Sequence, residues 1–296
     1  MISLSESDAL QQAGAMRPPL LRHLRVIAYT GAMPAQREPD SPPAPAPAPA
    51  PIVTTRGDRR TLEFTPGDIQ SEMRLSQPTA LVLEYTRAMM CFALLQPRPR
   101  HIVMVGLGGG SLAKFCHRHF PHARITVLEL RADVIALREA FAVPPDDARL
   151  RVLHCDGAAW LAAAAAQGAM ADVLLVDGFD AGGLPPSLSS AAFYADCRRV
   201  LRPGGVLVAN VFTYDPDYVT SVQRLRAAFG GALCWLSGIA GNNQILFAQR
   251  PAGAGAGPAL PLRLLRDSLG NRGLGTGWAN RMLARLLLVW LARRGA

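Results

Sequence analysis

A glycine-rich segment and a later carboxylate are spaced in a way that can hold a nucleoside. Residues 105–111 read VGLGGGS, directly after a predicted strand and before a predicted helix. Gly106, Gly108 and Gly110 let the backbone approach a ligand closely, and the helix start offers unpaired N–H donors. Glu129 comes 23 residues after Gly106, at the end of the next predicted strand, where a carboxylate can accept both hydroxyls of a ribose. The pattern predicts an adenosyl-binding turn; the alternative is a plain tight turn.

Three more carboxylates follow predicted strands. Asp156, with Gly157 after it, can accept the exocyclic amine of adenine, but an Asp before an alanine-rich helix is equally good capping chemistry. Asp177 ends an apolar strand and Asp180 follows three residues later. Ligands of open parallel sheets bind at the carboxyl ends of the strands, so both side chains should face one crevice. Two carboxylates there suit a cationic amine substrate, since one can bind an ammonium group and the other can take a proton. The alternative is a solvated loop.

Apolar runs alternate with helical segments from residue 101 onward. The predicted strands are 101–105, 124–130, 150–154, 172–177, 206–212, 232–236 and 245–249, and the predicted helices are 111–119, 132–141, 157–167, 191–200 and 216–228. The sequence RPGG at 202–205 predicts a turn. This alternation predicts an α/β Rossmann-like fold over 100–250, with a mainly parallel sheet and helices on both faces.

Residues 52–99 predict a small N-terminal unit. Segments 61–64 and 69–75 flank a Pro-Gly turn, which is typical of a short β-hairpin. Residues 79–95 predict a helix that ends before Pro97. The predicted fold is therefore a Rossmann-like domain with a short N-terminal β-hairpin extension.

Both ends of the chain differ in composition from the predicted core. Residues 1–51 finish in PPAPAPAPAP, which favours extended polyproline conformation, so we expect a disordered extension. Residues 251–258 predict a flexible linker, and 278–294 predict a basic apolar helix too short to span a bilayer. That helix can dock on the core, dock on a second subunit, or lie on an anionic membrane surface.

Charge and cysteine usage exclude several classes of protein. The formal charge of +9 is concentrated in residues 251–296, which carry +6, whereas 61–250 carry only +1. A nucleic-acid-binding domain would need clustered cations on the fold itself, so none is expected. No secretory signal or transmembrane segment is predicted, and five cysteines without paired spacing favour a reduced, cytoplasmic protein. The histidines around Cys116 match no closed zinc site, so no metal is expected.

The residues described above, with a few others, resemble a known enzyme family. The order of motifs is similar to that of the spermidine synthase (polyamine aminopropyltransferase) family over roughly residues 60–250: Gln70, Tyr85, the glycine-rich turn, Glu129, Asp156-Gly157, Asp177, Asp180 and Phe193-Tyr194. The family combines an N-terminal β-domain with a class I methyltransferase-type Rossmann domain. The resemblance implies transfer of an aminopropyl group from decarboxylated S-adenosylmethionine to a polyamine acceptor. It also implies that Gln70 and Tyr85 line the donor tail and the diamine channel.

The resemblance assigns roles to the remaining carboxylates. It implies that Glu129 holds the ribose and Asp156 the adenine of the donor. Asp177 is implied as the base toward the attacking nitrogen, and Asp180 as a ligand of the amine. A homodimer is common in this family. Tyr194 is expected to pack rather than to react.

The chain also departs from the family pattern. The family usually has Asp in the glycine-rich loop where Gly109 stands, His or Gln where Thr86 stands, and Pro where Ala181 stands. A late Tyr-Pro loop is replaced by LSGIAGNN at 236–243. If the aminopropyl interpretation is correct, Gly109→Asp is expected to improve binding of the decarboxylated donor.

Three other functions remain open from the sequence. A methyltransferase using intact S-adenosylmethionine is favoured by Gly109, because the loop then matches the general methyltransferase pattern. A nicotinamide enzyme fits less well, because the dinucleotide fingerprint places Gly or Ala at the position of Ser111. A non-catalytic nucleoside-binding or membrane-surface protein is suggested by the basic helix 278–294.

Overall fold

The fold is described from a computed structural model of the chain, over residues 49–168, 171–178, 183–236 and 242–253. These residues all belong to the compact unit Pro47–Ala296. The predicted disordered extension before residue 49, the linker beyond residue 253, the helix 278–294 and Asp180 lie outside the described residues.

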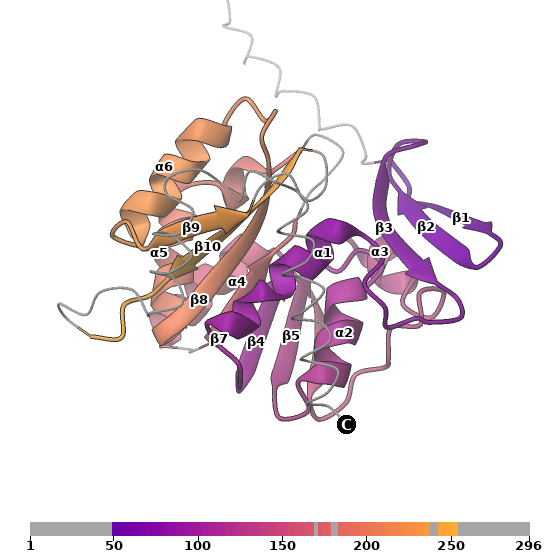
Figure 1. Ribbon diagram of the computed structural model, residues 1–296, viewed down its shortest axis with the longest axis horizontal. Helices are drawn as coiled ribbons and strands as arrows, with labels where there is room; N and C mark the ends of the chain where they lie inside the picture. The colour runs from indigo at the N-terminus through magenta and orange to yellow at the C-terminus, as the bar shows by residue number, and fades with distance from the viewer. Residues whose placement is uncertain (1–48, 169–170, 179–182, 237–241, 254–296) are drawn as a thin grey trace, which may run out of the picture. The chain divides into compact units, whose positions relative to one another are not determined.

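A seven-stranded sheet forms the centre of the fold (Figure 1). Its strands are, in spatial order, β6 (Leu150–His154), β5 (Arg124–Glu129), β4 (His101–Val105), β7 (Ala171–Val176), β8 (Leu201–Phe212), β10 (Asn243–Gln249) and β9 (Leu233–Leu236). The first five run parallel, and β10 is antiparallel to both of its neighbours. The sheet confirms the predicted Rossmann-like fold of methyltransferase type.

Helices cover both faces of this sheet because its strands are apolar on both sides, as β4 illustrates with five buried residues. One face packs against α1 (Glu84–Met89), the 3-10 helix η1 (Met90–Leu94), α2 (Ser111–His119) and α3 (Ala132–Ala136). The other packs against α4 (Gly157–Gln167), the 3-10 helix η2 (Pro186–Leu188), α5 (Ala191–Val200) and α6 (Tyr218–Ala228). The loops that follow the carboxyl ends of the strands carry the predicted site.

The N-terminal unit is larger than the predicted hairpin. Strands β1 (Ile52–Arg56), β2 (Arg59–Glu63) and β3 (Ile69–Arg74) form a three-stranded antiparallel sheet. The first strand escaped prediction because its sequence, IVTTR, follows the Pro-Ala run without a break signal. Strand β3 contacts α2, which brings this small sheet to the glycine-rich turn.

Three predicted boundaries were wrong. The helix predicted for 79–95 begins only at Glu84, and the guanidinium of Arg87 donates to the carbonyls of Leu81 and Val82 ahead of that start. The helix continues as the 3-10 helix η1 from Met90. The helix predicted for 132–141 ends at Ala136. The RPGG sequence is not a turn: it lies inside β8, where its irregular backbone is absorbed by a register shift against β7.

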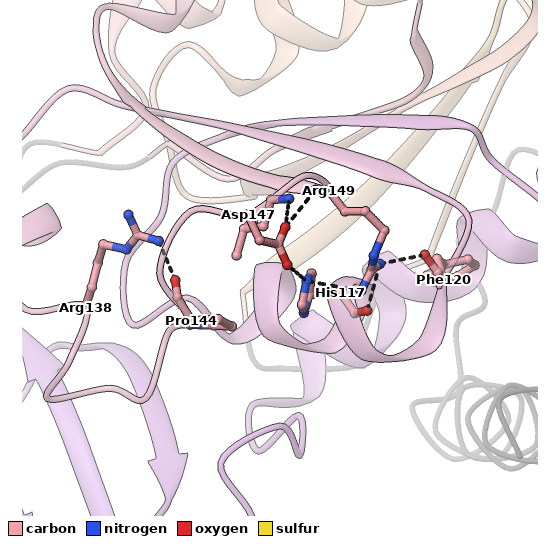
Figure 2. Close-up of polar contacts among 7 residues, drawn as sticks. His117, Phe120, Arg138, Pro144, Asp147 and Arg149 are labelled. Atoms are coloured by element: carbon pink, nitrogen blue, oxygen red, sulfur yellow. Dashed lines mark hydrogen bonds and ion pairs between the residues drawn. The ribbon is translucent and has the colours of Figure 1, made fainter.

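A polar cluster fastens the loop between α3 and β6 to α2 (Figure 2). Asp147 accepts hydrogen bonds from the backbone N–H groups of Leu150 and Arg149 and pairs with Nε2 of His117 at 2.8 Å. These contacts, with the backbone donors contributing most, lower the pKa of Asp147 to about 2. His117, one of the histidines near Cys116, is thus engaged by a carboxylate. Among the described residues, no group of His, Cys, Asp and Glu side chains that could hold a metal occurs.

Candidate active site

A pocket of about 620 Å³ opens at the carboxyl ends of the parallel strands, beside β3 and α1. Among the described residues its lining includes five carboxylates and a single cation, Arg131; the carboxylates are Asp68, Glu84, Glu129, Asp156 and Asp177. Residues 61–250 carry a net charge of only +1, so the acidic lining is a local feature of the pocket. Such a lining attracts a cationic ligand.

Glu129 is held rigidly at one side of the pocket. Its side chain is only 7% exposed. The Oε2 atom accepts the backbone N–H of Leu107 at 2.7 Å, and Oε1 accepts that of Arg131 at 2.9 Å. Each oxygen keeps a further lone pair. The carboxylate is therefore oriented by the backbone and can still accept two hydroxyl groups.

Gly106 brings the glycine-rich turn against the end of β7. Its φ is +94°, and a Cβ at this position would lie 2.3 Å from the carbonyl oxygen of Asp177. Only glycine fits that conformation and that approach. Gly106 and Gly108 both line the pocket, as predicted for a ligand-binding turn.

Gly110 and Gly109 are placed differently from the prediction. Gly110 is the N-terminal cap residue of α2, and it does not belong to the described lining of the pocket. Gly109 is buried, and a Cβ there would lie 2.6 Å from Oγ of Ser71 and 2.8 Å from Cδ1 of Phe141. An Asp side chain does not fit this space. These contacts argue against the expectation that Gly109→Asp improves donor binding, which stays a prediction.

Asp156 has the capping role that the sequence left open. Its Oδ1 accepts the backbone N–H groups of Ala158 and Ala159 at the start of α4. Both Asp156 and Gly157 also line the pocket. Oδ2 of Asp156 makes no hydrogen bond within the described part of the chain, so the carboxylate can cap the helix and still accept one donor from a ligand.

Asp177 is held between two side chains that come from distant parts of the sequence. Asn210 donates to Oδ1 at 3.0 Å, and the hydroxyl of Tyr85 donates to Oδ2 at 3.1 Å. Burial raises the pKa of Asp177, and these two hydrogen bonds act against that rise. Burial, together with the neighbouring Asp177, also raises the pKa of Tyr85 well above its ordinary value. The hydroxyl of Tyr85 therefore stays protonated and can continue to donate.

The other predicted residues are distributed as follows. Gln70 lines the pocket, but its side-chain amide donates to Asp68. Thr86 is buried and donates to the carbonyl of Leu83. Tyr194 is 1% exposed and packs edge-on against Phe193, which confirms the packing role predicted for it.

Sequence reasoning missed several residues that shape the pocket. Asn210, Asn242 and Asn243 line the end near Asp177, and Arg131 packs over the ring of Phe64 at 4.5 Å. The available signal for Asn210 was a lone amide inside the apolar run that forms β8. The arginine carried no signal, because an Arg after a strand end is common.

Comparison with known proteins decides the family. The sequence model of the spermine/spermidine synthase domain matches residues 83–230. A polyamine aminopropyltransferase of Chromobacterium violaceum is 34% identical over 209 residues, which are 70% of this chain and 79% of that protein. The chain belongs to the spermine/spermidine synthase family. The described lining of the pocket of this family member includes Gln70, Tyr85, Gly106, Gly108, Glu129, Asp156, Gly157 and Asp177. It does not include Gly109, Gly110, Phe193 or Tyr194, and Asp180 is not described.

Solved structures support the same fold. A probable spermidine synthase from Corynebacterium glutamicum superposes with a TM-score of 0.59 at 21% identity, covering 79% of this chain and 90% of that one. Human methyltransferase-like protein 13, solved in complex with SAH, superposes with a TM-score of 0.55 at 24% identity, covering 70% of this chain and 92% of that one. Both comparisons establish the methyltransferase-type fold. Within the described residues, no helix of this spermidine synthase family member is long and apolar enough to cross a membrane.

Proposed function

We propose that this chain transfers an aminopropyl group from decarboxylated S-adenosylmethionine to a polyamine acceptor. The observation that carries the proposal is the acidic pocket, whose described lining contains five carboxylates and one guanidinium group. The decarboxylated donor carries a sulfonium and an ammonium group, and the acceptor is a cationic amine. Intact S-adenosylmethionine adds a carboxylate, which such a lining disfavours.

Binding of the donor is assigned to the rigid side of the pocket. Glu129, held by two backbone donors, accepts the two ribose hydroxyls, and Asp156 accepts the exocyclic amine of adenine. Gly106 and Gly108 allow the backbone to approach the donor. Gln70 is proposed to line the donor tail.

Asp177 is the proposed base. The acceptor nitrogen attacks the carbon next to the sulfonium sulfur, a C–N bond forms, and the C–S bond breaks with its electron pair going to sulfur. The proton released from the attacking nitrogen passes to Asp177. Partial burial raises the pKa of this carboxyl, which improves it as a proton acceptor. The remaining task is alignment of the amine with the reacting carbon, and Tyr85 lies beside the base to shape that path.

A methyltransferase activity is the second candidate, and one observation favours it. Where the family usually has a loop Asp, this chain has Gly109 packed against the hydroxyl of Ser71, which lies 3.4 Å from that of Ser111. Neutral hydroxyl groups tolerate the carboxylate of the intact donor. The acidic lining elsewhere argues against this alternative.

Donor preference can be tested by thermal unfolding of the full chain with each donor. A ligand that binds only the folded state raises the unfolding temperature by mass action. A larger rise with the decarboxylated donor supports aminopropyl transfer. A larger rise with intact S-adenosylmethionine contradicts it and favours methyl transfer. Loss of the rise in Glu129→Ala is expected with either donor.

A further inference from the structure

Two asparagines form a chain of hydrogen bonds that ends on Asp177. Asn243 donates from Nδ2 to Oδ1 of Asn210 at 2.9 Å, and Asn210 donates from Nδ2 to Oδ1 of Asp177 at 3.0 Å. Asn210 is 2% exposed. In the antiparallel pairing of β8 with β10, Asn210 lies opposite Ile245, so Asn243 is its diagonal neighbour on the same face of the sheet. The contact is therefore built into the strand register.

The first contact fixes the direction of the second. An asparagine amide has one accepting oxygen and one donating nitrogen. Because Oδ1 of Asn210 accepts from Asn243, its Nδ2 must face Asp177. A rotated amide would place an oxygen against the carboxylate, and the two would repel each other. Asn243 thus acts on Asp177 only through Asn210.

The second oxygen of Asp177 is held from the opposite side. Tyr85, on α1, donates to Oδ2, and α1 contacts both β8 and β10. Tyr85 is the titratable group in contact with Asp177. The other charged groups that line the pocket are Asp68, Glu84, Glu129, Asp156 and Arg131, and none of them forms a hydrogen bond or ion pair with Asp177 in the described residues.

We propose that Asn210 and Asn243 are positioning residues, which orient the Asp177 carboxylate and hold it ionised so that it accepts the proton of the attacking amine. With one fixed donor on each oxygen, the plane of the carboxylate is set and the remaining lone pairs face the substrate. The inference rests on the proposed function, because it takes Asp177 as the base. It adds two residues to which no role was assigned by the motifs.

The test is the pH dependence of kcat/KM for Asn210→Leu, Asn243→Leu and the double variant, in the full chain. Removal of a hydrogen bond to an ionised carboxylate disfavours the ionised form. The acid limb of the pH profile of kcat/KM should therefore move to higher pH in Asn210→Leu. The expected shift is about one pH unit, which corresponds to the free energy of one hydrogen bond to a charged group. Asn243→Leu should shift it in the same direction by less, and the double variant should match Asn210→Leu, since Asn243 acts through Asn210.

A matched control lies next to Asn243. Gln244 is also a buried amide on β10, but it accepts from the hydroxyl of Tyr218 and does not line the described pocket. Gln244→Leu should leave the acid limb in place. Unfolding temperature and methylthioadenosine affinity, measured for every variant, show whether each protein is folded with a working nucleoside site.

The possible outcomes separate this inference from the proposed function. Folded variants whose acid limb does not move overturn the positioning role. A loss confined to the KM of the amine also overturns it and makes the asparagines direct amine ligands. Additive shifts overturn the relay through Asn210. Asp177→Asn is measured in parallel: retained transfer in that variant overturns Asp177 as the base. Its inactivity combined with an unmoved limb in Asn210→Leu overturns only the positioning role.

Discussion

Glu129→Gln probes the nucleoside end of the pocket with a change of one atom. In the native chain both oxygens of Glu129 accept backbone N–H groups, at 2.7 Å from Leu107 and 2.9 Å from Arg131. A glutamine has one accepting oxygen, and its NH2 group can only donate. One of the two backbone donors therefore loses its partner, and one side of the group can no longer accept a ribose hydroxyl.

The expected magnitudes follow from these contacts. A buried N–H group left unpaired costs about 1–3 kcal/mol of folding free energy. A hydrogen bond from a hydroxyl to a carboxylate contributes about 1.5–3 kcal/mol, so loss of one weakens nucleoside binding roughly 10- to 150-fold. The change should fall on affinity for any ligand that carries the adenosine ribose, whichever group the donor transfers.

Titration calorimetry with methylthioadenosine measures this effect, and Glu72→Gln is the matched control. Glu72 is also a buried glutamate, 7% exposed, but it accepts from Arg59 and lies outside the described lining of the pocket. Its replacement should leave nucleoside affinity unchanged. A ligand without the ribose 2′-hydroxyl should bind the native protein more weakly, while Glu129→Gln should discriminate less between the two ligands. Unchanged methylthioadenosine affinity in folded Glu129→Gln would refute the ribose assignment.

Three further predictions concern stability. In urea titrations, Gly106→Ala should reduce the free energy of unfolding by about 1–3 kcal/mol more than Gly67→Ala does. Both glycines have positive φ, but a Cβ would meet another residue only at Gly106. Equal losses in the two variants would refute the steric role of Gly106. Burial lowers the pKa of Lys114 to about 8, so between that pH and about 10.5 the unfolded chain binds more protons than the folded protein. The free energy of unfolding should therefore rise with pH in this range relative to that of Lys114→Met. Parallel curves of unfolding free energy against pH for the two proteins would contradict this prediction. The pKa of Asp147 is lowered to about 2, so the stabilisation by this carboxylate is present above about pH 4 and lost toward pH 2. Asp147→Asn should therefore lose less stability than the native chain between about pH 4 and pH 2. An equal loss in both proteins would exclude the Asp147 cluster as the cause of the acid destabilisation.

The predictions that succeeded depend on local sequence rules. Alternating apolar runs and helices were enough for the parallel sheet, because each strand is recognisable by itself. Glu129 and Asp177 were found because polar residues at the ends of buried strands meet at one edge of a parallel sheet. For Asp156 the sequence left two interpretations open; its contacts with α4 show the capping role, and the adenine role stays a prediction.

The predictions that failed depend on contacts between distant segments. Asn210 was missed because it lies 33 residues from Asp177 in sequence and no spacing rule connects the two. Tyr85, 92 residues from Asp177, was named only through the family resemblance. The space available to a side chain at Gly109 is limited by Ser71, which belongs to the small N-terminal sheet. The RPGG sequence has strong local turn propensity, yet it lies inside β8, where β7 pairs with Leu201 and Val206 and leaves the four residues between them unpaired with it.

The most direct test of the central claim is to identify the product formed when both donors compete. The full chain is incubated with equal amounts of decarboxylated and intact S-adenosylmethionine and a diamine, and the products are identified by mass spectrometry. Aminopropyl transfer predicts methylthioadenosine and an amine heavier by one aminopropyl group, with neither product formed by Asp177→Asn. S-adenosylhomocysteine with a methylated amine, or no product while the donors still bind, would contradict the account.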